Sequence, residues 1–168
     1  MSGRTGLSGH AAVLGTEDGG GRGRRFLELS VLLTGFGRVQ LTGTGMAGAY
    51  LRALDEVLPA GVLDELLAAL GRVPAGADDE AAAAAILADP KLGPVARNII
   101  IMWYCGTWTQ LPQEWRTAYG TSPLDSTRVI SAEAYQSGLQ WVAAGAHPAG
   151  ARPQGFGAWS LPPEGARG

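Results

Sequence analysis

The sequence has few of the residues that most enzymes use for chemistry. Of its 168 residues, one is a cysteine (Cys105) and two are histidines (His10 and His147). A single cysteine excludes an internal disulfide, and no cluster of Cys, His and carboxylate residues has the spacing of metal ligands. The formal net charge is −2 without a basic stripe, which argues against a nucleic-acid partner. No apolar run reaches about 18 residues, so the sequence predicts no membrane span.

Two further features resemble catalytic or cofactor sites, and we interpret both as structural. Cys105 lies in an apolar helical stretch with no histidine near it in sequence, which favours an inert buried thiol. Gly43, Gly45 and Gly48 have the spacing of a dinucleotide-binding loop. That loop needs a preceding strand inside a βαβ unit, whereas the pattern around these glycines is helical. We therefore expect no catalytic residue, no metal and no cofactor in this chain.

The apolar residues, which make up 46% of the chain, recur mainly at spacings of three and four, as in helices that bury one face. No strand pattern of useful length is present. The predicted helices run from residue 26 to the glycines at 35 and 37, and then over about 46–57 and 62–71. An alanine-rich helix is expected to start at the carboxylates of residues 78–80 and to end at Asp89-Pro90, and two more helices are expected over about 92–108 and 132–144. Residues 109–128 are predicted to form a long loop. The expected fold is all-α, a compact bundle of five or six helices with a long irregular C-terminal tail.

The chain divides into three predicted parts. Residues 1–23 are rich in Gly and Ser and predict a disordered leader, residues 24–146 a helical domain, and residues 147–168 a tail. Arg24, Arg25, Phe26 and Leu27 resemble a twin-arginine export signal. Glu28 interrupts the short apolar stretch that follows, so we interpret these arginines as the approach to the first core helix.

The tail carries large aromatic side chains in a segment that cannot be regular. Nine of the twelve aromatic residues lie after position 100, and all five tryptophans are among them. Residues 147–168 contain too much Pro and Gly for a helix or an interior strand, yet they include Phe156 and Trp159. Such a tail either packs on this protein's own core or reaches a partner.

An estimate of the energies favours additional contacts for the tail. Complete burial of Phe156 and Trp159 contributes about 8–12 kcal/mol. Ordering the backbone of residues 147–159 costs about 13–26 kcal/mol, less for the prolines. Two aromatic side chains alone do not hold the tail down, and a partner surface is a natural source of the missing contacts.

The order of several short motifs resembles a known family of accessory subunits. The motifs are Phe26-Leu27-x-Leu29-Ser30-x-x-Leu33-Thr34-Gly35-Phe36, Leu41-Thr42-Gly43-Thr44-Gly45-Met46-Ala47-x-x-Tyr50, Trp103-Tyr104-x-Gly106, Tyr135-x-x-Gly138-Leu139-x-Trp141, His147-Pro148, and Pro153-x-Gly155-Phe156-Gly157-x-Trp159-x-x-Pro162-Pro163. In this order they are similar to the small subunits of membrane-associated flavin-dependent sugar and polyol dehydrogenases. That group includes the D-sorbitol dehydrogenase small-subunit family, and the gamma subunit of bacterial FAD glucose dehydrogenase and the third subunit of gluconate 2-dehydrogenase are relatives.

The resemblance implies a non-catalytic role. Such subunits hold no FAD. They bind a large flavoprotein of the glucose-methanol-choline type, support its folding, and often carry a twin-arginine signal for its export. A cytochrome c subunit commonly passes the electrons on to the respiratory chain. This sequence lacks the usual long N-terminal signal, so the expectation is a cytoplasmic version of the complex.

The expected contacts with the flavoprotein are aromatic residues and the tail. The predicted interface consists of Trp103, Tyr104, Trp108, Trp141, His147, Pro148, Gly155, Phe156, Gly157 and Trp159. A helical adaptor or chaperone for an unrelated partner remains the alternative function.

Overall fold

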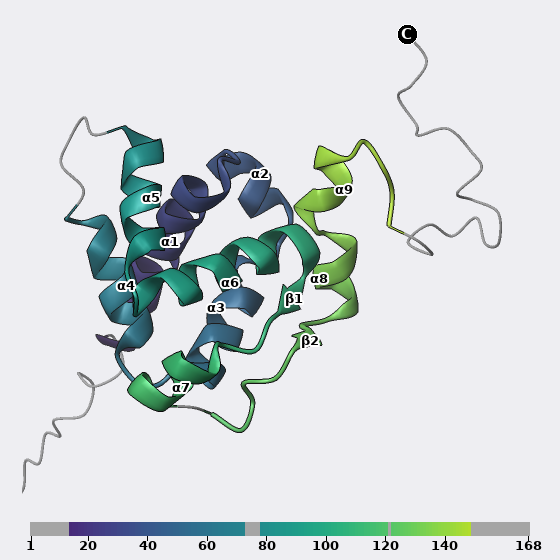
Figure 1. Ribbon diagram of the computed structural model, residues 1–168. Helices are drawn as coiled ribbons and strands as arrows, with labels where there is room; N and C mark the ends of the chain where they lie inside the picture. The colour runs from purple at the N-terminus through teal and green to yellow at the C-terminus, as the bar shows by residue number, and fades with distance from the viewer. Residues whose placement is uncertain (1–13, 73–77, 121, 149–168) are drawn as a thin grey trace, which may run out of the picture.

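The computed structural model describes residues 14–72, 78–120 and 122–148, and this part of the chain is mostly helical (Figure 1). The prediction of an all-α fold is confirmed. The elements in chain order are α1 (Leu14–Thr34), α2 (Arg38–Gly43), α3 (Ala47–Val57), α4 (Val62–Leu70), α5 (Asp79–Ala88), α6 (Leu92–Cys105), β1 (Thr107–Trp108), α7 (Gln113–Tyr119), β2 (Arg128–Val129), α8 (Ala132–Gln136) and α9 (Leu139–Ala143).

Two helices, α1 and α6, organise the molecule. Helix α1 packs against α2, α3, α4, α5 and α6, and α6 also packs against α4, α5, α8, α9 and β1. Large side chains meet at their crossing. The ring of Trp103 stacks on Phe26 with the centroids 6.3 Å apart, and Tyr50 of α3 meets the same indole edge-on at 4.9 Å. All three side chains are buried. The apolar spacing that predicts these helices therefore also identifies their buried faces.

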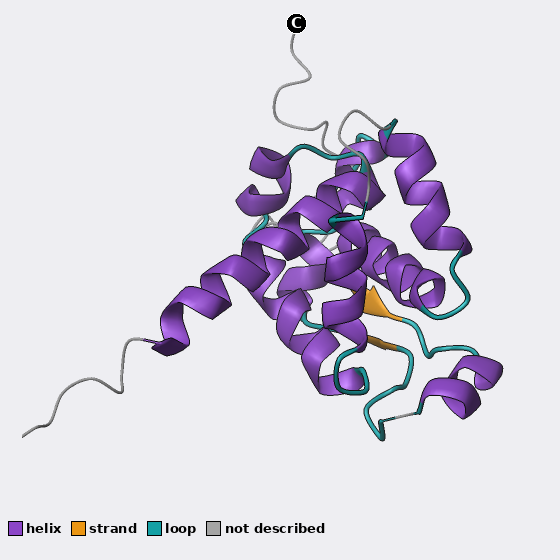
Figure 2. Ribbon diagram, turned by 90° about the vertical axis from the view of Figure 1, so that its left-hand side faces the viewer, coloured by secondary structure: helices purple, strands orange, loops and turns teal. Residues whose placement is uncertain are grey.

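The first helix begins earlier than the sequence predicts. Helix α1 starts at Leu14, so the boundary placed after residue 23 falls inside it, and its first turns project from the body (Figure 2). Arg22 holds this part of the helix in place. Its guanidinium lies 2.7 Å from Asp55 of α3 and 2.9 Å from Asp64 of α4. These two carboxylates raise the pKa of Arg22. Residues 1–13 of the predicted leader lie outside the described residues.

Several other helix boundaries were wrong. The helix expected over 92–108 ends at Cys105, because Gly106 adopts a left-handed conformation (φ 66°). Trp108 lies instead in β1, which pairs antiparallel with β2 (Thr107 opposite Val129) and forms a small ladder that the sequence did not predict. The helix expected over 132–144 is interrupted at Ser137 and Gly138 and forms α8 and α9.

Two short helices were missed. Helix α2 has six residues, including a threonine and a glycine, and shows no full apolar period. Helix α7 lies inside the segment predicted as a loop, between Pro112 and Gly120, where its single buried aromatic residue is Trp115. Of the predicted tail, residues 149–168 lie outside the described residues.

Candidate functional site

Three of the motifs that carry the family resemblance meet around Tyr104, near the C-terminal end of α6. The ring of Tyr104 packs edge-on against Phe36, which follows α1, with the centroids 5.7 Å apart. The Tyr104 hydroxyl donates a hydrogen bond of 3.4 Å to the carbonyl oxygen of Thr34. Segments separated by about seventy residues in the sequence are therefore joined at one side chain.

The third motif reaches the same place through two close backbone contacts. A Cβ added at Gly106 would lie 2.4 Å from the carbonyl carbon of Ala134, and one added at Gly138 would lie 2.6 Å from the carbonyl oxygen of Tyr104. Real Cβ atoms do not approach backbone that closely. Glycine at both positions lets the α8–α9 segment pack directly on the end of α6.

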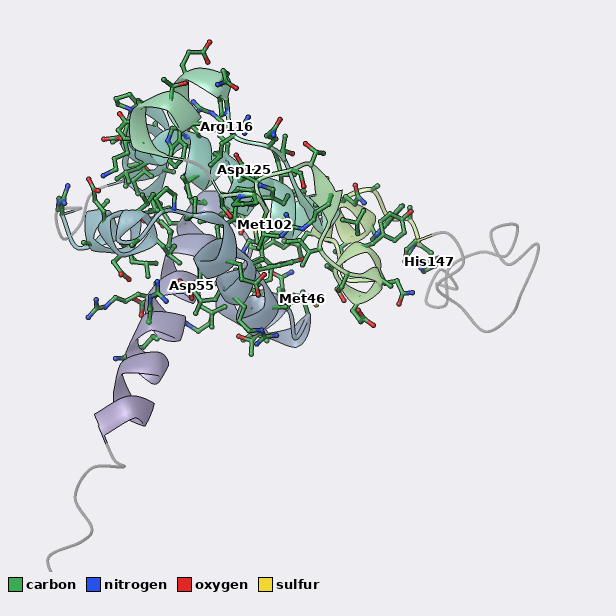
Figure 3. The ribbon with its side chains drawn as sticks, turned by 90° about the horizontal axis from the view of Figure 1, so that it is seen from below. Met46, Asp55, Met102, Arg116, Asp125 and His147 are labelled. Atoms are coloured by element: carbon green, nitrogen blue, oxygen red, sulfur yellow. The ribbon has the colours of Figure 1, made fainter. Side chains whose placement is uncertain are left out.

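The α8–α9 segment is fixed by its own aromatic pair. Tyr135 and Trp141 meet edge-on with the ring centroids 5.3 Å apart, and the indole N–H of Trp141 donates a hydrogen bond of 2.8 Å to the Tyr135 carbonyl oxygen. The amide of Ala146 donates to the Trp141 carbonyl oxygen at 2.8 Å. These bonds set the direction in which the chain leaves α9 toward His147, which Figure 3 labels at the far side of the molecule from Arg116 and Asp125.

An open groove lies between α2 and the α8–α9 segment. Its volume is about 380 Å³, and it is lined by Phe36, Gln40, Gly43, Thr44, Ser137, Leu139 and Val142. Leu139 is buried, whereas Val142 is 68% exposed. The groove therefore has an apolar part, formed by Phe36, Leu139 and Val142. Polar side chains border it on both sides, Gln40 and Thr44 from the α2 segment and Ser137 from the α8–α9 segment. Sequence reasoning missed this site, because its residues come from two segments about a hundred positions apart.

The structure corrects part of the predicted interface. Trp103 and Trp108 are 1% and 0% exposed, so both belong to the core and present no surface to a partner. They are buried because α6 is central and because β1 turns the Trp108 indole inward, where its N–H donates to Asp125 at 2.9 Å. The sequence signal for both was aromatic content, which does not distinguish core from interface.

The other predicted interface residues differ in exposure. Tyr104, Trp141 and Pro148 are half-buried, and His147 is exposed. Gly155, Phe156, Gly157 and Trp159 lie outside the described residues, so the prediction for the tail stays a prediction.

The main buried polar cluster, around Asp125, is used internally. Besides the Trp108 indole, Oδ1 of Asp125 accepts the Leu111 amide at 3.1 Å, and Oδ2 lies 3.3 Å from Nε of Arg116. Figure 3 shows Arg116 and Asp125 side by side. The carboxylate is 3% exposed. Its role is to tie the β1–α7 connection to the loop before β2, and no substrate is needed to explain it.

Other candidates for chemistry give no site either. Burial, and secondarily the neighbouring Cys105, raises the pKa of Tyr50, so this phenol stays protonated at neutral pH. Cys105 itself is half-buried and unpaired with another cysteine. Within the described residues, no group of three or more His, Cys, Asp or Glu side chains is placed to hold a metal ion. No helix in the same part of the chain is long and apolar enough to cross a membrane.

Comparisons of the chain with protein-family models, with curated proteins and with solved structures find no match. The candidate site consequently rests on the geometry of this chain. It comprises the groove between α2 and α9, and the half-buried Tyr104 and Trp141 that fix its walls.

Proposed function

We propose that this chain is a non-catalytic accessory small subunit that binds and stabilises a large FAD-dependent dehydrogenase of the glucose-methanol-choline type. The proposal begins from the ordered motifs that resemble the small subunits of flavin-dependent sugar and polyol dehydrogenases. In this assignment the partner holds the FAD and carries out proton and hydride transfer. A cytochrome c or another acceptor takes the electrons, and the complex resides in the cytoplasm.

The observation that supports a binding role most strongly is where some of the motif residues lie. Phe26, Leu29 and Leu33 are buried, and core packing explains them. Core packing does not explain Gly43, which is exposed. Thr44 is half-buried, and its hydroxyl also holds the α2–α3 turn by donating to the Leu41 carbonyl oxygen and accepting the Met46 amide. These two residues line the groove together with Phe36 and Leu139, which belong to two other motifs.

The groove is therefore formed by separate segments that also carry the family resemblance. This combination supports its assignment as a partner-binding surface. Half-buried aromatic and apolar groups with a polar rim are typical of the energetic centre of a protein interface. We assign the groove, Tyr104, Trp141, His147 and Pro148 to the partner-binding surface. The tail residues Gly155, Phe156, Gly157 and Trp159 complete it, so the subunit is a helical bundle with an irregular, interacting tail.

The test is to co-express the full chain with the product of a neighbouring reading frame, if that frame encodes a large flavoprotein. We expect a yellow complex that oxidises a sugar or polyol, a colourless preparation of this chain alone, and a less soluble flavoprotein when this chain is omitted. A stoichiometric flavin spectrum from the isolated chain would overturn the assignment. A captured partner that holds no flavin would support the adaptor alternative instead.

The contribution of the tail is tested by Phe156→Ala combined with Trp159→Ala. Aromatic anchors typically contribute about 2 kcal/mol or more each to an interface, so we expect at least a tenfold loss of co-purified flavoprotein. The helical circular dichroism of the isolated chain should not change. Leu124→Ala is a suitable control, because Leu124 is 48% exposed on the α7–β2 loop, which lies away from α2 and α9 in Figure 1.

A further inference from the structure

The groove lies close to the point where the described chain ends. Val142 of α9 lines it, and only five residues lie between Val142 and Pro148, the last described residue. Figure 1 shows α2 and α9 at the same side of the molecule, with the chain continuing from α9. The tail therefore begins beside a groove that no described side chain fills.

We propose that the segment 155–159 of this same chain occupies the groove and places its aromatic side chains between α2 and α9. Eight residue steps separate Pro148 from Phe156, and an extended chain of that length spans about 26–29 Å. Four residues lie between Ala143, the end of α9, and Pro148, so a segment of that reach can turn back toward the groove.

The chemistry of the groove suits an aromatic occupant. Phe36, Leu139 and Val142 supply apolar contacts, while Gln40, Thr44 and Ser137 supply polar groups. An aromatic side chain buries about 150–250 Å² and, in tryptophan, carries an N–H that needs an acceptor. Phe156 and Trp159 are the only aromatic residues of the sequence that lie outside the described residues.

The tether favours this segment over a separate molecule. A short covalent linker holds its end at an effective concentration on the order of millimolar, well above that of most free partners. Pro148 and Pro153 restrict the unbound linker and so reduce the entropy lost on docking. Gly155 and Gly157 flank Phe156 and allow the backbone to approach the groove closely. The lining of the groove and the stiffened linker add to the contribution of the two aromatic side chains. The contact therefore forms in the isolated chain, and the flavoprotein binds the surface that the seated segment completes.

Disulfide trapping in the isolated full-length chain tests the proposal. In a Cys105→Ser background, Ser137→Cys is combined with Ala158→Cys, and oxidised glutathione converts the two thiols to a disulfide. Ser137 lines the groove, and Ala158 lies between the two aromatic residues without replacing either. The matched control pairs Ala158→Cys with Ser126→Cys, an exposed serine on the α7–β2 loop.

We expect the Ser137 pair to cross-link at least tenfold faster than the Ser126 pair. Val142→Asp should abolish that advantage, because it places a charge in the groove. Val39→Asp should leave it intact, because Val39 is 85% exposed on α2 but does not line the groove.

Equal rates for the two serine pairs would overturn the proposal, as would an advantage that survives Val142→Asp. If trapping fails while Val142→Asp still reduces co-purification of the flavoprotein, the groove receives the partner and the proposed function stands. If trapping succeeds and no flavoprotein is captured, the tail contact stands and the proposed function fails.

Discussion

Helix α6 is held in the fold through two regions that work by different means. On the side that packs against α1 and α3, Trp103 interlocks with Phe26 and Tyr50 through large buried side chains. At its C-terminal end, α8 and α9 are joined to it through Gly106 and Gly138, where backbone meets backbone. The first region gains stability from the apolar area that it buries, and the second from the close approach that the absence of a side chain permits.

This difference determines how each region responds to substitution. Replacing a buried aromatic residue with a smaller one destabilises the protein, because a cavity remains. Replacing a glycine in close backbone contact with a larger residue also destabilises the protein, because the opposing backbone has to move. The two regions should therefore show opposite dependence on side-chain volume.

The largest effect is expected for Trp103→Ala in the first region. Removing a fully buried indole should lower the free energy of unfolding by about 3–5 kcal/mol. Denaturant unfolding followed by circular dichroism measures it. Trp103→Phe should cost clearly less, because it keeps the ring contacts and removes an indole N–H that finds no hydrogen-bond partner within the described part of the chain. Equal losses for the two variants would show that the indole is not part of a tightly packed core.

The next effect is expected for Gly106→Ala in the second region. Strain in the left-handed backbone and the clash with Ala134 together should cost about 2–5 kcal/mol. Gly35→Ala is the matched control. Gly35 has a similar φ of 73°, compared with 66° at Gly106, but no heavy atom stands within 4 Å of its added Cβ.

The control separates backbone strain from contact. Gly35→Ala should cost about 1 kcal/mol, since only the left-handed conformation opposes it. The difference between the two variants in melting temperature and denaturation midpoint then measures the close approach alone. Indistinguishable stabilities would mean that α8 moves away from α6 at little cost, and the contrast between the regions would be lost.

A smaller effect is expected for Asp125→Asn, which tests a third means of attachment. The amide oxygen still accepts the Trp108 indole and the Leu111 amide, both of which bond to Oδ1, but the N–H₂ group takes the place of Oδ2 and faces Arg116. We expect a loss of about 1–3 kcal/mol, typical of an unsatisfied buried polar group. Tryptophan fluorescence should report the change, because Trp108 bonds directly to this carboxylate. Unchanged stability and fluorescence would show that the loop before β2 is held by other contacts.

Sequence patterns predicted the first region far better than the second. Helices α3, α4 and α6 follow from apolar spacing, whereas the start of α5 is fixed by Asp78, whose side chain accepts the Glu80 amide. The predicted end of α6 was wrong because the apolar Trp108 fits the apolar pattern of the helix. The left-handed conformation of Gly106, which ends the helix, depends on what this residue packs against. A glycine that is required for a close backbone contact leaves no periodic pattern in the sequence from which that contact could be predicted.

The groove could not be predicted for a related reason. Helix α2 is too short for a clear period, and the break between α8 and α9 at Gly138 is fixed by its contact with Tyr104. The groove exists only after both segments are placed. The sequence predicted instead an interface of aromatic residues, of which Trp103 and Trp108 are core.

The smallest effect concerns the start of α8. The Ser131 hydroxyl accepts the Ala134 amide at 3.0 Å and caps the helix. Ser131→Ala should cost about 1 kcal/mol. Hydrogen bonds from the backbone and from Ser131 lower the pKa of Glu133.

The sign of the pH effect follows from that direction. A carboxylate with a lowered pKa in the folded state adds stability above its ordinary pKa, and the stability is lost as the pH falls through the folded value. The stability difference between Glu133→Gln and the unaltered chain should therefore be present at neutral pH and vanish well below about pH 4. A difference that is constant with pH would show that Glu133 makes no such bonds in solution.

The burial of α1 has a consequence for any sorting signal in this chain. Phe26, Leu29 and Leu33 follow Arg24 and Arg25 directly and lie inside the core. A peptidase that cut after residue 34 would remove these side chains and leave α6 without the helix it crosses. Cleavage at that point is consequently incompatible with the packing of α1 on α6.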